Sequence, residues 1–205
     1  MMATPPRLKA QWFKPEQAKN PAQTGSAIAF IAWRVASHTI KRLREAGFDI
    51  DAGPAYFGVL RELLVFLLAG ADRIAYARLG GEGRTPFTTT LVLRASELLD
   101  ENEADLLGPL PDGASYADRF VEQFNVLSGH YAEFGWSDDE GPDFAFTRYL
   151  GHRLEPLVPE KDRRWVLDQV MAAEVPEAVA MLSQAMAGVF SSEPRRARRA
   201  SMSGE

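Results

Sequence analysis

One segment of this chain is apolar on nearly every side of a helix, and it constrains the fold more than any other stretch. The segment begins after Gly53-Pro54, a pair that suits a helix start, and Gly80-Gly81 marks its end. Its large apolar residues fall on all helical faces: Phe57, Leu60, Leu63, Leu64, Val65, Phe66, Leu67 and Leu68. A helix without a polar face has to be enclosed by other elements. The sequence therefore predicts that this second helix is the central one.

The most apolar part of this segment is too short to cross a bilayer. It comprises nine residues, 63–71, with two charged residues on each side, whereas a membrane span needs about 20 residues. Residues 21–33 carry no charge, but they continue into Arg34 without a convincing small-residue cleavage site. We therefore expect no transmembrane segment, no signal peptide and a cytoplasmic location.

Apolar residues recur at steps of three and four through most of the remaining chain, which is typical of amphipathic helices. Helices are predicted to begin near residues 24, 54, 85 and 116, and further ones at Pro142, Pro159 and Pro176. No segment alternates for long between apolar and polar residues, so a sheet is not expected. The sequence predicts an all-α fold, a single-domain bundle of about seven helices over residues 21–191.

Composition excludes several classes of function. The net charge of −5 and the pI near 5.3 argue against specific nucleic-acid binding by the whole fold. The chain has no cysteine, which excludes disulfides, cysteine-ligated metals and a thiol nucleophile. It also lacks a phosphate-binding glycine loop, a nucleophile elbow and a His-Glu-x-x-His motif. These absences favour a non-catalytic protein without a cofactor, and an enzyme whose groups meet only in the fold remains an open alternative.

The pattern Phe-x4-Gly-His-x2-Glu occurs twice, in Phe124, Gly129, His130 and Glu133 and again in Phe146, Gly151, His152 and Glu155. A histidine and a glutamate three positions apart share one helical face. Imidazole and carboxylate groups on two facing helices suit zinc, iron or manganese. The order is the reverse of the Glu-x-x-His of di-iron proteins, however, and no partner glutamates accompany it.

Three interpretations of this repeat stay open: a metal site at the two His–Glu pairs, acid–base chemistry, and close helix packing at the two glycines. Glycine inside a helix costs on the order of 1 kcal/mol relative to alanine. Two such costs at matching positions favour the packing interpretation, with the two helices antiparallel and in close contact at Gly129 and Gly151.

An acidic cluster, Asp138, Asp139, Glu140 and Asp143, lies before and within the first turn of the helix predicted from Pro142. Its ligand spacing does not match a calcium loop. Negative charge is favourable near a helix start, so this cluster is interpreted as helix capping.

Three further segments are candidate partner-binding surfaces. Residues 1–20 form an expected extended arm that carries Trp12 and Phe13, which either dock on the same domain or anchor a partner. Arg34, His38 and Arg42 form a basic stripe at helical spacing, which is either a solvated face or an anion-binding one. Residues 192–205 form an expected disordered basic tail with Arg195, Arg196, Arg198 and Arg199.

Taken together, these features favour a non-catalytic helical adaptor or assembly protein that binds a protein partner. The alternative is a metal- or small-ligand-binding helical bundle that uses the His130/Glu133 and His152/Glu155 pairs. Homo-oligomerisation is an open alternative for the partner.

Overall fold

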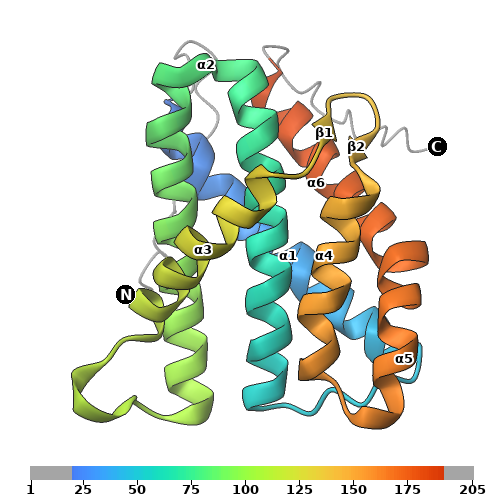
Figure 1. The fold of residues 1–205 in the computed structure, drawn as a ribbon. Helices are drawn as coiled ribbons and strands as arrows, with labels where there is room; N and C mark the ends of the chain where they lie inside the picture. The colour runs from blue at the N-terminus through green and yellow to red at the C-terminus, as the bar shows by residue number, and fades with distance from the viewer. Residues whose placement is uncertain (1–19, 192–205) are drawn as a thin grey trace, which may run out of the picture.

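The segment that is apolar on all sides forms the first half of helix α2 (Pro54–Leu107) in the computed structural model, which describes residues 20–191. At Gly80, with φ 63° and ψ −172°, the helix turns back on itself (Figure 1). Glycine adopts such a positive φ without strain. The result is two arms, a first arm of residues 54–79 and a second arm of residues 81–107. Every residue from 62 to 71 is buried, which confirms the predicted central apolar helix.

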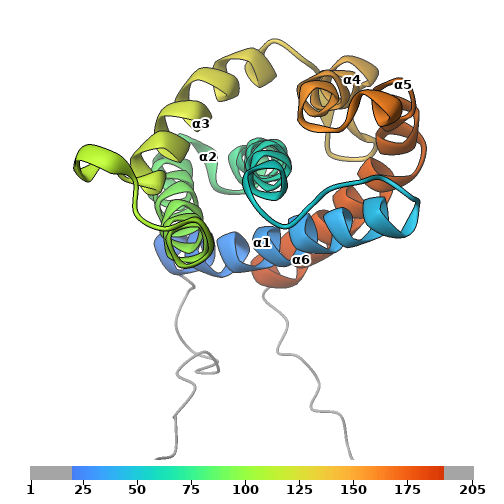
Figure 2. The same cartoon turned by 90° about the horizontal axis from the view of Figure 1, so that it is seen from below.

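The other helices surround the first arm, as the end-on view in Figure 2 shows. They are α1 (Pro21–Glu45), α3 (Tyr116–Ala132), α4 (Phe144–Leu154), α5 (Glu160–Gln169) and α6 (Val175–Phe190). Shorter elements connect them: the 3₁₀ turns η2 (Pro111–Gly113) and η3 (Glu155–Leu157), the π turn η4 (Val170–Glu174) and the strands β1 (Trp136–Ser137) and β2 (Gly141–Pro142). The all-α prediction is thereby confirmed. The predicted arm with Trp12 and Phe13 lies outside the described residues apart from Asn20, which caps α1.

The predicted helix start at Pro142 differs from the structure, whereas Pro176 lies in the first turn of α6, as predicted. Pro142 belongs to strand β2, which pairs antiparallel with β1, and α4 starts at Phe144 after its cap Asp143. Pro176 is the second residue of α6, and the helical path nevertheless runs from α5 through η4 into α6 without a loop. Proline has no N–H and crowds the carbonyl four residues earlier, so the helix widens into a π turn before it. The expected number of about seven helices is not confirmed.

Charged residues at the start of the apolar run are paired with side chains of neighbouring helices. Nη1 of Arg61 lies 2.5 Å from Oε1 of Glu103, which joins the two arms of α2. Glu62 accepts hydrogen bonds from Arg153 of α4 and Gln123 of α3. Both carboxylates are buried, Glu62 at 4% and Glu103 at 0% exposure. A buried charge is tolerated only when it is paired, so these contacts specify which helices lie beside the first arm.

The charged residues at the other end of the run are paired as well. Asp72 accepts hydrogen bonds from Arg84 and from Thr88, which hold the bend between the two arms. Arg73 donates to three carbonyls at the C-terminal end of α3, at 2.9 to 3.2 Å, where a cation is favourable. Helix α2 is long and apolar enough to cross a membrane, but 72% of its most apolar window is buried within the protein. A core helix has this property.

Candidate binding groove

The two His–Glu pairs of the repeat lie on the surface, each with its own local contact. Nδ1 of His130 lies 2.6 Å from the Tyr149 hydroxyl, and Glu133 is the exposed C-cap of α3. Nδ1 of His152 lies 3.4 Å from a carboxylate oxygen of Glu155 in the next turn. Within residues 20–191, no group of three or more His, Asp or Glu side chains is arranged to hold a metal ion. The pairs therefore do not combine into one ligand set.

The glycines of the repeat do not mark a contact between the two helices that carry them. A methyl group added at Gly129 would meet no atom within 4 Å, whereas one added at Gly151 would overlap with Leu167 of α5. The prediction of close packing of these helices at both glycines is therefore wrong. A β-hairpin connects the helices, and α3 runs obliquely across the protein while α4 turns away from it (Figures 1 and 2). A tight helix–helix turn would have been needed to place them side by side.

Two of the three residues of the basic stripe contact glutamates of η4 and α6 at the protein surface. Nε of Arg42 donates to Glu174 at 2.9 Å, and its Nη1 lies 2.6 Å from Glu177. Nε2 of His38 lies 3.2 Å from the other oxygen of Glu177. The hydrogen bond to Glu174 raises the pKa of Arg42. Only Arg34 of the stripe is exposed without a hydrogen bond or ion pair among the described residues. The tail residues Arg195, Arg196, Arg198 and Arg199 lie outside this part of the chain.

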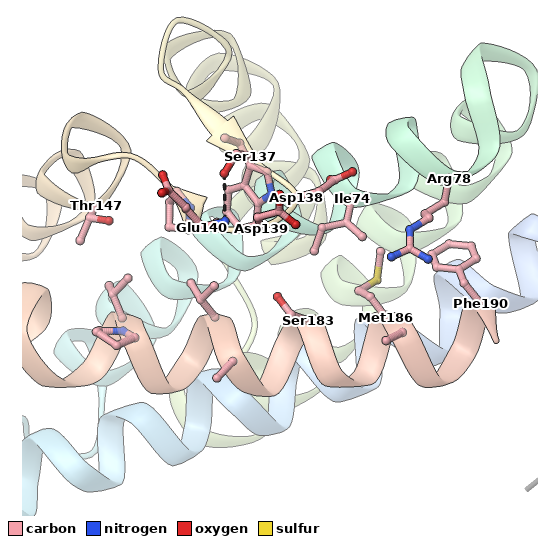
Figure 3. A pocket seen from close by; sticks show the side chains of 18 of the residues that line it. Ile74, Arg78, Ser137, Asp138, Asp139, Glu140, Thr147, Ser183, Met186 and Phe190 are labelled. Atoms are coloured by element: carbon pink, nitrogen blue, oxygen red, sulfur yellow. Dashed lines mark hydrogen bonds between the residues drawn. The ribbon is translucent and has the colours of Figure 1, made fainter.

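A half-open groove with a volume of about 510 Å³ lies between the β-hairpin and α6. We define it by its floor, its wall and its charged rim. Its floor consists of Val175, Val179, Met186 and Phe190 from α6 and Ile74 from α2. Its wall is the hairpin, residues 136–142. Figure 3 shows these side chains around an open space above α6.

Along the groove, α6 turns small residues toward the opening. Pro176, Ala180, Ser183 and Ala187 follow each other at steps of four, three and four, and all four are exposed and line the groove. Residues at this spacing lie on one helical face. The adjoining side of α6 faces the core, with Leu182 and Met186 fully buried. The small-residue face leaves room for another chain to approach the α6 backbone.

The wall of the groove is anchored in the protein core by Trp136. Gly70 of the first arm has no side chain at this point, and a methyl group there would lie 2.7 Å from Cη2 of Trp136. The indole also packs edge-on against Phe146, at 5.3 Å between ring centres. At the other strand, a methyl group on Gly141 would lie 3.2 Å from Cγ1 of Val179. The hairpin is therefore held against both α2 and α6.

Charged side chains without internal partners stand on the rim. Asp138, Asp139 and Glu140 at the hairpin tip are exposed and form no ion pair among residues 20–191. Figure 3 shows Arg78 beside Phe190, at the end of the groove where α6 ends, and within the described part of the chain its guanidinium has no hydrogen bond or ion pair either. The rim thus has a negative part over the middle of α6 and a positive part at its end.

The capping interpretation of the acidic cluster is correct for one of its four residues. Asp143 accepts from the backbone N–H groups of Phe146 at 2.7 Å and Gly135 at 2.8 Å. The side chains of Asp138, Asp139 and Glu140 cap no helix and line the groove instead. The sequence did carry a sign that capping could not explain the whole cluster: it has four acidic residues, whereas one N-cap uses only one carboxylate.

The chain matches no protein-family model, no curated protein and no solved structure. No residue role can therefore be transferred from a relative. Its function is inferred from the groove, which combines an apolar floor with carboxylates that lack partners within residues 20–191.

Proposed function

We propose that the protein is a non-catalytic helical adaptor whose groove binds a basic, apolar segment of a protein partner. One observation carries the proposal: three carboxylates, Asp138, Asp139 and Glu140, stand over an apolar floor without a cation of their own within residues 20–191. Basic side chains of a partner would supply that cation, while its apolar side chains would cover Val179 and Phe190. Complementary charge of this kind increases association rate and specificity.

The length and openness of the groove favour a peptide segment over an enclosed small molecule. Its lining extends along α6 from Val175 to Phe190, a distance of about 22 Å at the rise of an α-helix. This length suits an amphipathic helix of three to four turns or so, which would place side chains three and four positions apart on the floor. The small exposed residues of α6, Ala180 and Ser183 among them, would permit close contact. No comparable arrangement favours the alternative site at His130 and His152.

The proposal is tested by selecting binders from a displayed library of helical peptides with the full-length protein. We expect the selected peptides to combine two or more basic residues with an apolar face. Ser183→Trp should fill the groove and weaken their binding by at least about tenfold, which corresponds to about 1.4 kcal/mol. Gln184→Trp is the matched control, since Gln184 is the next exposed residue of α6 and does not line the groove.

A second variant tests the charge of the rim. Replacing Asp138, Asp139 and Glu140 by their amides should lower the affinity of the protein for the selected peptides and reduce the salt dependence of that binding. Selected peptides that are acidic, or that bind the Ser183→Trp protein as well as the parent, would overturn the proposal.

A further inference from the structure

We infer that the C-terminal segment of this chain, residues 192–205, docks in the groove and competes there with the partner. The competition rests on the proposed function, whereas the docking itself does not. Three observations support the docking: where α6 ends, how far the following residues reach, and the order of charges in the segment and in the groove.

The described chain ends at the groove itself. Phe190, the last residue of α6, lines the groove, and Ser191 then leaves the helix with φ −66° and ψ 134°, an extended conformation. Residues 192–205 follow directly, in the sequence Ser-Glu-Pro-Arg-Arg-Ala-Arg-Arg-Ala-Ser-Met-Ser-Gly-Glu. Pro194 suits a turn, which is what a chain needs to double back along the helix it has just left.

The distance from the end of α6 to the hairpin matches the reach of the arginine-rich part of the segment. The hairpin meets α6 at Val179, about 16 Å from Phe190 along the helix axis at 1.5 Å per residue. An extended chain spans about 3.4 Å per residue, so residues 195–199, counted from the turn at Pro194, reach between about 3 and 17 Å back along α6. The last arginines of the segment therefore reach the acidic part of the rim, about 16 Å from Phe190.

The order of charges in the segment is complementary to the order in the groove. From the end of α6 inward, the groove presents first Arg78 beside Phe190 and then the three hairpin carboxylates (Figure 3). The segment presents first Glu193 and then four arginines in five residues. Glu193 would thus pair with Arg78, and the arginines with Asp138, Asp139 and Glu140. Arginine is well suited to this role because its guanidinium binds carboxylates through two parallel hydrogen bonds.

Because the segment is covalently attached, its effective concentration at the groove is on the order of millimolar. Weak individual ion pairs are sufficient for occupancy at that concentration. A partner peptide must displace the segment before it binds, which makes the segment an internal regulator of access.

The absence of cysteine from the chain permits a direct test by engineered disulfide formation in the full-length protein. Ser183→Cys in the groove is combined with Ala197→Cys in the segment, and the intrachain disulfide is followed under oxidised glutathione. The matched control combines Ala197→Cys with Ala114→Cys, an exposed residue in the loop between η2 and α3 at the opposite end of the protein (Figure 1). We expect the groove pair to form at least about ten times faster, since a disulfide needs the two Cα atoms within about 7 Å.

The segment starts near the groove, and this proximity alone would also speed disulfide formation by the groove pair. The dependence of that rate on charge therefore decides the inference. Replacing Asp138, Asp139 and Glu140 by amides should slow the disulfide by at least about fivefold, and high salt should do the same in the parent. A rate that is unchanged by both treatments would overturn the docking.

The experiments distinguish failure of the docking proposal from failure of the adaptor function. Reversing all four arginines (R195E, R196E, R198E, R199E) should strengthen binding of the selected library peptides by about threefold or more, because their competitor is removed. Peptide binding that persists without charge-dependent disulfide formation would overturn the docking and support the adaptor function. A charge-dependent disulfide without any binding peptide would support the docking and overturn the adaptor function.

Discussion

Arg153 of α4 holds the buried carboxylate of Glu62 with two hydrogen bonds, 2.6 Å from Nη2 to Oε1 and 3.1 Å from Nε to Oε2. Gln123 of α3 donates a third at 2.9 Å. Glu62 immediately precedes the run that is apolar on all sides, and only 4% of it is exposed. The hydrogen bond to Glu62 raises the pKa of Arg153. A single carboxylate thereby attaches α3 and α4 to the central arm.

Arg153→Ala should destabilise the protein by about 2 kcal/mol. Removing one partner of a buried ion pair costs about 3–5 kcal/mol, and the 40% exposure of the Arg153 side chain lets water solvate part of the remaining charge. Urea unfolding measures the change. Arg148→Ala, at an exposed position of the same helix, is the control and should change the free energy of unfolding by less than about 0.5 kcal/mol. Equal effects of the two substitutions would contradict the role given to Arg153.

Glu103 makes folding stability depend on pH in the acid range. Burial raises the pKa of Glu103 above its ordinary 4.5, and Arg61 opposes this shift only in part. Oε2 of Glu103 has no hydrogen-bond partner among the described residues. As pH rises above 4.5 toward the raised pKa, the unfolded chain loses this proton before the folded protein does. The contribution of Glu103 to stability therefore falls with rising pH over that interval.

Glu103→Gln should remove this dependence, so that the stability of the variant relative to the parent increases with rising pH over the same interval. Urea unfolding from about pH 4 to about pH 8 measures the difference. Glu101→Gln, two positions away and exposed, is the control and should show no such trend. A difference between Glu103→Gln and the parent that stays constant with pH would contradict the prediction.

The two glycines of the repeat should respond to alanine in opposite directions. Gly129→Ala introduces a methyl group into open space, so the helix preference of alanine should stabilise the protein by up to about 1 kcal/mol. Gly151→Ala forces Leu167 to move and should destabilise it by about 1 kcal/mol, at the low end of overpacking costs because a leucine side chain can turn away. Thermal unfolding of the two single variants measures both effects. Stabilisation by both would show that Leu167 yields freely.

Gly70→Ala should displace the wall of the groove. Its methyl group would lie 2.7 Å from Cη2 of Trp136, in a fully buried part of the first arm where the backbone cannot yield. We expect a loss of about 2 kcal/mol in unfolding free energy and a changed near-ultraviolet circular dichroism spectrum from the indole. Gly81→Ala, which meets no atom within 4 Å, should leave the spectrum unchanged. An unchanged spectrum for Gly70→Ala would mean that Trp136 does not rest on Gly70.

The helical character of the chain and the identity of its central helix could be predicted from the sequence. Both follow from local spacing: steps of three and four place Ile28, Val35 and Leu43 on one buried face, and the lack of any polar face places residues 62–71 inside. The break at Gly80 and the cap at Asp143 are also local, because they depend on the conformation of one residue.

The tertiary structure alone decided which helices meet and where the groove lies. Glu62 pairs with a residue 91 positions away, and the rim carboxylates face the groove because a β-hairpin, rather than a tight helix turn, joins α3 to α4. The same hairpin separates Gly129 from Gly151, which the sequence pattern had placed together. Helical periodicity specifies which face of each helix is apolar, but the geometry of the connections specifies which faces come into contact. That geometry depends on contacts between residues far apart in the chain, and spacing along the sequence does not contain it.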